Sequence, residues 1–126
     1  MKPRETTLRL KRFEATERAR KVASIETMIN DFEHVAVDLA RQIAAEEERT
    51  GIKDPAHFAY STFAKAAGLR RANLLTSVAD LRIKLEAARA EHAEVLGEIG
   101  RLEPVLEPRD VDRQLRKADH PGAAIG

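Results

Sequence analysis

Apolar residues recur along both halves of the chain at alternating steps of three and four. This spacing is that of the a and d positions of a heptad repeat, which line up as one apolar stripe along a helix. The sequence therefore predicts an all-α protein built from two long amphipathic helices. The first stripe is Val22, Ile25, Ile29, Phe32, Ala36, Leu39 and Ile43, and the second is Leu74, Val78, Leu81, Leu85, Ala88, His92, Val95, Ile99 and Leu102.

A predicted turn separates the two stripes. Gly51 suits the left-handed residue that follows a helix end, and Asp54 with Pro55 suits the cap and first turn of a new helix. We therefore expect helices at about 5–49 and 55–103, joined by a turn at 50–54. Because so short a connection forces the helices to lie side by side, residues 1–103 are predicted to form an antiparallel two-helix coiled-coil hairpin.

Residue numbers suggest a register for this hairpin. Antiparallel coiled coils place a layers opposite d layers, and five such pairs have residue numbers that add up to 103, which centres the fold between Gly51 and Ile52. A slip of one heptad would move the centre to 48 or 55, so the orientation is better determined than the register. The five pairs are Val22 with Leu81, Ile25 with Val78, Ile29 with Leu74, Ala36 with Ala67, and Ala15 with Ala88.

The charge distribution favours the same orientation. Residues 1–24 carry eight basic and three acidic side chains, and residues 25–50 carry two and seven. Residues 51–73 carry four basic side chains and one acidic side chain, and residues 74–103 carry four basic and six acidic side chains. An antiparallel hairpin places the basic first segment beside the acidic last one, and the acidic second segment beside the basic third, whereas two parallel copies would stack like charges.

Beyond the second helix, which Pro104 ends, residues 104–126 are predicted to be a flexible tail. A short helix could form within it over 109–118, but the flanking Pro and Gly residues favour mobility.

The composition points away from an enzyme. Only 4% of the 126 residues are aromatic, and the absence of cysteine excludes a disulfide framework, a thiolate metal site and a cysteine nucleophile. No glycine-rich phosphate loop occurs, and a two-helix rod has no concave pocket for acid and base groups. His34 and Asp38 have a spacing that two metal ligands could use, but a closed site needs three or four. We therefore expect no catalytic, cofactor-binding or metal site.

The sequence also gives an expectation for location. The N-terminal segment is too charged for a signal peptide, and no stretch approaches the roughly 20 apolar residues of a membrane span. A chain without cysteine needs no oxidising environment and is compatible with a reducing compartment. We expect a cytoplasmic protein that does not insert into the membrane.

Two surfaces remain as candidate partner sites. The basic arm, RLKRF from Arg9 and RARK from Arg18, has Lys11 and Arg18 at d positions where apolar residues are expected. It could enter an acidic channel of a protein or bind phosphates, or it could be a solvated face of the coiled coil. At the other end, four large apolar side chains either pack on one another or form a docking knob. These tip residues are Ile52, Phe58, Tyr60 and Phe63.

The chain resembles the small coiled-coil stalk protein of the bacterial flagellar type III export apparatus. The likeness lies in RLKRFE near the start, in the block QIAAEEERTGIKDPAHFAYSTFAKAAGLRRANLLTSV from Gln42 to Val78, and in the two flanking heptad helices. It covers about residues 5–103, and the central block is its most specific part. The chain is shorter than many members of that family, and the segment after Pro104 matches nothing in it.

The resemblance implies a non-enzymatic cytoplasmic component, associated with the membrane periphery at the flagellar base, that supports protein export, flagellum assembly and motility. Its expected partners are the hexameric export ATPase, the export gate and export chaperones. In that family the open end of the hairpin enters the ATPase ring, so the tip would point toward the gate. The implied ring-binding residues are Arg4, Arg9, Lys11, Arg12, Arg18 and Arg20, and the implied gate-facing residues are Ile52, Phe58, Tyr60 and Phe63.

Two other functions fit the same sequence. An arm that binds RNA through its cations predicts a steep dependence of affinity on salt. A generic adaptor or chaperone for unfolded export subunits would need exposed apolar grooves in place of a charged end.

Overall fold

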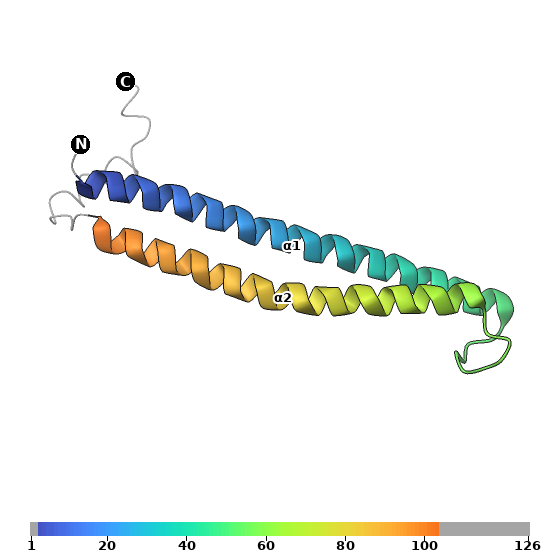
Figure 1. Cartoon of the computed structure of the whole chain (residues 1–126). Coiled ribbons are helices and arrows are strands. Elements are labelled where there is room, and N and C mark those ends of the chain that lie inside the picture. Colours follow the sequence, from blue (N-terminus) through green and yellow to red (C-terminus); the bar gives the residue numbers. More distant parts are fainter. Residues whose placement is uncertain (1–2, 104–126) are drawn as a thin grey trace, which may run out of the picture.

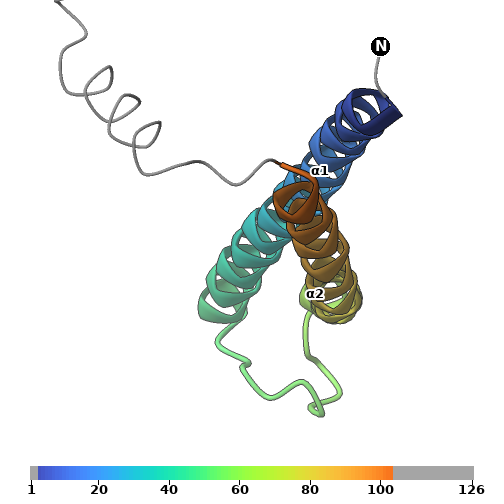
Figure 2. The same ribbon diagram turned by 90° about the vertical axis from the view of Figure 1, so that its left-hand side faces the viewer.

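The computed structural model describes residues 3–103, which form two long helices. α1 spans Pro3–Thr50 and α2 spans Thr62–Leu102, with 48 and 41 residues. They run antiparallel and side by side from the open end, where α1 begins and α2 ends, to the loop that joins them (Figure 1). Figure 2 looks along the rod from the open end and shows the two helices crossing one another. The predicted all-α helical hairpin is confirmed.

An apolar seam between the helices forms the core. Within residues 3–103 every buried side chain is apolar, and most of them occupy the predicted a and d positions. The seam contains two clusters, and Val22 and Phe32 pack against the first while Leu8 packs against the second. The first cluster consists of Ile25, Ile29, Val78, Leu81, Leu85 and Ala88, and the second consists of Ala15, Val95 and Ile99.

The register predicted from residue numbers is wrong by one heptad. Ala15 packs with Val95 in the second cluster, whereas its predicted partner Ala88 belongs to the first. Ion pairs across the seam agree with this shift, since the residue numbers of Lys11 and Glu98 add up to 109. The hairpin is therefore centred near residue 55, one of the two positions that a one-heptad slip allows. A shift of seven residues keeps every apolar side chain facing the seam, so the stripe itself could not distinguish the two registers.

The length of the loop explains the shift. The connection occupies residues 51–61, so α2 begins at Thr62 and not at residue 55 as predicted. Asp54 and Pro55 form a turn, in which the Asp54 carboxylate accepts from the Ala56 N–H at 2.9 Å and the His57 N–H donates to the Asp54 carbonyl at 3.0 Å. Proline suits the second position of such a β-turn as well as the first turn of a helix. Here Pro55 belongs to a β-turn and not to a helix.

Both helix ends at the loop are capped. Gly51 has a φ of 74°, and its N–H donates to the Glu47 carbonyl at 2.9 Å, which is the left-handed helix end predicted from sequence. Ser61 caps α2, because its hydroxyl oxygen accepts from the Ala64 N–H at 3.2 Å. The predicted tail and its short helix over 109–118 lie outside the described residues.

Ion pairs link the helices along the flanks of the seam. Arg18 contacts Glu91 at 2.7 Å near the open end, and Arg82 contacts Glu33 at 3.1 Å further along the rod. The basic first segment thus lies beside the acidic end of α2, as the charge pattern predicts. The acidic second segment finds its interhelical partners at Arg82 and Arg89, further along α2 than predicted, because the register is shifted. Such exposed pairs add little stability, but they oppose other registers.

Candidate partner-binding surfaces

The open end carries the predicted basic arm, and two of its cations lie in the seam itself. Lys11 and Arg18 occupy d positions, where an unpaired charge would be costly. Lys11 contacts Glu14 of its own helix and Glu98 of α2. Arg18 contacts Glu91 at 2.7 Å and Glu14 at 3.8 Å. Acidic residues of both helices therefore neutralise the charged seam positions, and no partner protein is needed to explain them.

The pair between the helices shifts the pKa values of both its members. The hydrogen bond from Lys11 lowers the pKa of the Glu98 carboxyl. The hydrogen bonds to Glu98 and then to Glu14 raise the pKa of the Lys11 ammonium. Each shift favours the charged form, so the contact persists as an ion pair across the neutral pH range.

The other four residues of the predicted ring-binding set lie on the outside of the hairpin. Three of them are engaged within the hairpin, whereas Arg9 makes no ion pair or side-chain hydrogen bond within residues 3–103. Arg9 is therefore the cation of this set that is most available to a partner. The engaged residues are Arg4, whose Nε donates to the Leu102 carbonyl at 2.7 Å, Arg12, which contacts Glu103 at 3.3 Å, and Arg20, which contacts Glu17 at 2.9 Å.

Two exposed apolar residues lie beside Arg9 and are missing from the predicted site. Leu10 is 64% exposed and Phe13 is 66% exposed. They are three residues apart and so share one face of α1. We call Arg9, Leu10 and Phe13 the open-end patch. The signal was available in the sequence, because a large apolar residue away from the a and d stripe has no role in the seam.

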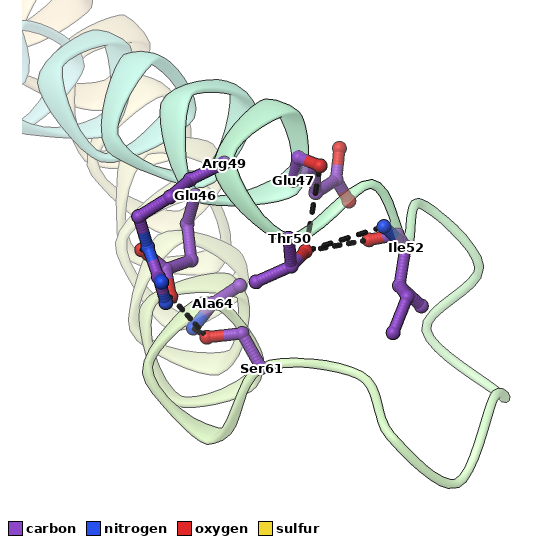
Figure 3. A network of polar contacts seen from close by, with 7 residues as sticks. All are labelled: Glu46, Glu47, Arg49, Thr50, Ile52, Ser61 and Ala64. Carbon is purple, nitrogen blue, oxygen red and sulfur yellow. Dashed lines mark hydrogen bonds and ion pairs between the residues drawn. The ribbon is translucent and has the colours of Figure 1, made fainter.

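At the other end, polar contacts tie the loop to the last turn of α1. The Ser61 hydroxyl donates to the Glu46 carboxylate at 3.0 Å, and Arg49 contacts the same carboxylate (Figure 3). The hydrogen bonds from Arg49 and then from Ser61 lower the pKa of Glu46. The Tyr60 hydroxyl donates to Glu47 at 2.7 Å. These contacts hold the two ends of the loop together while its middle extends away from the helices.

The four predicted tip residues do not form one cluster. Phe58 is 96% exposed and Phe63 is 55% exposed, whereas Ile52 and Tyr60 are half-buried. The Phe58 ring stacks on the ring of His57 with centroids 4.8 Å apart. The interpretation in which the four residues pack on one another is therefore wrong for Phe58 and Phe63, because the long loop carries Phe58 away from the helix ends. An exposed aromatic side chain at the tip leaves the docking interpretation open.

The described residues, 3–103, contain neither a candidate metal site nor a helix that could span a membrane. Within residues 3–103 no group of three or more His, Cys, Asp or Glu side chains could hold a metal ion. His34 is exposed, Asp38 contacts Arg41 at 3.7 Å, and the three residues line a shallow hollow of about 350 Å³ on α1 alone. Neither α1 nor α2 has a stretch long and apolar enough to cross a bilayer.

Comparisons with known proteins give a plain result. No family model, curated protein or solved structure matches this chain. The resemblance to the flagellar export stalk is therefore based on the quoted sequence blocks alone. The fold is established separately, by the two helices and the seam between them.

The pair between Lys11 and Glu98 predicts a pH-dependent contribution to stability. Because the pKa of Glu98 is lowered on folding, the pair stabilises the hairpin above the unfolded value of 4.5 and this contribution is lost as pH falls through the folded pKa. Glu98→Gln removes that charge, so its stability deficit relative to wild type should be present at about pH 7 and shrink at about pH 3. Urea unfolding followed by circular dichroism measures it.

Glu94→Gln is the matched control for this experiment. Glu94 is exposed on the same helix and makes no ion pair within residues 3–103. Its deficit should stay close to zero at both pH values. A Glu98→Gln deficit that is equally large under acidic and neutral conditions would contradict the assigned role of the pair.

Proposed function

We propose that this chain is a non-enzymatic stalk of the flagellar type III protein export apparatus. In this proposal the open end enters the pore of the hexameric export ATPase, and the tip reaches toward the export gate. The protein would act in the cytoplasm at the flagellar base and support protein export and flagellum assembly. The sequence blocks that resemble the stalk family motivate the proposal.

The open-end patch is the observation that carries the proposal. It combines an arginine that is free of ion pairs within the described residues with Leu10 and Phe13, which are both about two-thirds exposed. Arginine and aromatic side chains are enriched among the residues that dominate binding at protein interfaces. A partner that surrounds the open end could bury the apolar pair and bind the guanidinium group with an acidic residue.

The shape of the molecule supports a linking role. α1 has 48 residues, which corresponds to about 72 Å at 1.5 Å per residue. Its two ends expose different features, since the open-end patch lies at one end and the exposed Phe58 at the other. A rod of this kind can bind two partners at once without bringing them into contact.

The RNA-binding alternative is less well supported. Nonspecific nucleic-acid binding depends on many cations that are available to phosphates. Here Lys11, Arg12, Arg18 and Arg20 are already paired with glutamates of the hairpin, and these acidic partners would repel phosphates. A polynucleotide shift assay at moderate salt should therefore give no complex.

Stimulation of the cognate export ATPase tests the proposal. We expect the wild-type chain to raise ATP hydrolysis and to promote ring assembly. The double variant Arg9→Glu with Phe13→Ala should raise the chain concentration needed for half-maximal stimulation by about tenfold or more. Neither residue has a partner in the seam, so the double variant should fold normally, which circular dichroism checks.

Two controls separate the ends of the rod. Arg70→Glu makes the same charge change at an exposed position of α2 that lies away from the open end, and Phe58→Ala removes the aromatic ring at the tip. Both should stimulate the ATPase like wild type. Absence of stimulation by the wild-type chain would refute the proposed role, and equal losses in all variants would refute the assignment to the open-end patch.

A further inference from the structure

The face of α2 that points away from α1 carries two large exposed apolar residues. Leu69 is 64% exposed and Ile83 is 72% exposed, although neither belongs to the a and d stripe. They lie seven residues before and seven residues after Thr76, and so they share one line along the helix. Ala72 and Ala79 lie exposed between them on the same side. We call these residues the outer α2 face.

The order of residues on this face is complementary to itself when reversed. An antiparallel second copy, placed with a two-fold axis at Thr76, brings Leu69 of one copy onto Ile83 of the other, and the reverse. Ala72 then meets Ala79, which lets the two helices approach closely because both side chains are small. A parallel copy would instead place each residue on its own counterpart.

The charges at the two ends of the face follow the same symmetry. Lys65 is exposed and makes no ion pair within residues 3–103, and Glu86 contacts only Arg89 of its own helix, at 3.4 Å. Lys65 and Glu86 lie almost equally far from Thr76 on opposite sides, so in the antiparallel arrangement each lysine meets the second copy's glutamate. The contact occurs twice in the dimer, whereas a parallel arrangement would oppose lysine to lysine.

The residue at the centre brings no unsatisfied polar group into such an interface. The Thr76 hydroxyl donates to the Ala72 carbonyl at 3.1 Å, within its own helix. Burying Thr76 against its counterpart therefore costs no hydrogen bond. The overlap would extend over residues 62–90, which leaves the open end of each copy projecting beyond it.

We propose that the protein forms a two-fold symmetric dimer through the outer α2 face, with the two rods antiparallel and the axis at Thr76. The interface buries Leu69 and Ile83 of both copies and is bordered by two pairs of Lys65 with Glu86. This dimer uses neither the open-end patch nor Phe58, so it is independent of the proposed stalk function.

Sedimentation equilibrium of the full chain tests the dimer. We expect a reversible dimer with a dissociation constant on the order of 10 μM. Thr76→Lys should weaken it by about 100-fold or more, because two ammonium groups then meet at the axis. Thr27→Lys is the matched control, since Thr27 is exposed on the outer side of α1 and its hydroxyl donates to the Ala23 carbonyl at 3.0 Å in the same way. A chain that stays monomeric up to about 1 mM, or equal weakening by both lysine variants, overturns the proposal.

A charge exchange tests the orientation of the two copies. Lys65→Glu alone should weaken the dimer by about tenfold, because it places glutamate against Glu86 at two symmetric positions. Adding Glu86→Lys to the same chain should restore wild-type affinity. Failure of the second change to restore binding would overturn the antiparallel arrangement, even where a dimer is present.

Discussion

Replacing Leu85 with alanine is expected to lower the free energy of unfolding by about 3 kcal/mol. Leu85 is 7% exposed and packs in the first cluster with Ile25, Ile29 and Ala88. The alanine variant loses the burial of the removed side-chain atoms and leaves a gap in the seam that the surrounding side chains fill only in part. Urea unfolding followed by circular dichroism measures the change, and the midpoint should fall without a change in slope.

Leu96→Ala is the matched control on the same helix. Leu96 is 49% exposed and belongs to neither of the two clusters of the seam. Its replacement should cost less than about 1 kcal/mol, since alanine also has the higher helix propensity. Equal losses for the two leucines would mean that the seam does not run through Leu85.

The sequence was sufficient for the fold class because one signal governs it. Apolar residues follow one another at alternating steps of three and four along both halves of the chain. Two helices that face each other bury both of the resulting apolar stripes. The sequence predicts the end of α1 at Gly51 correctly, because glycine readily adopts the positive φ that a residue after a helix end needs. Ile25, Ile29 and Leu81 could therefore be assigned to the core from their positions alone.

The register could not be obtained in the same way. A heptad repeat looks the same after a shift of seven residues, so the choice depends on the length of the loop. That length depended on Asp54 and Pro55, which fit a helix start and a β-turn equally well, while Ser61 is a second good cap. Nothing local distinguishes the two caps, because both offer an oxygen to the N–H groups of the next turn.

The missing register also hid the role of the charged seam positions. The predicted register places Arg18 opposite Leu85, where a cation would have no partner and would suggest an external one. The observed register places Arg18 beside Glu91 at 2.7 Å. The exposure of Phe58 was hidden for a related reason, since a short turn would have kept the tip residues against the helix ends.

Introducing a carboxylate at Ala88 is expected to have the largest effect on the fold. Ala88 is 1% exposed and belongs to the first cluster, where the buried neighbours within the described residues are all apolar. Ala88→Asp would place an ionised group there without a partner, which costs about 4 kcal/mol or more. A hairpin of two helices has a single apolar seam as its core and therefore a small free energy of unfolding. The variant should be largely unfolded at neutral pH and lose most of its helical circular dichroism.

The pH dependence of this variant identifies the cause. Burial raises the pKa of a carboxyl, so the folded form of Ala88→Asp binds a proton more tightly than the unfolded chain and regains stability as pH falls. Ala93→Asp is the control, because Ala93 is exposed on the same helix and its replacement should cost only about 0.7 kcal/mol of helix propensity. The difference in stability between the two variants should therefore narrow between about pH 7 and about pH 4. A difference that stays constant over this range would show that the size of the new side chain, and not its charge, disrupts the seam.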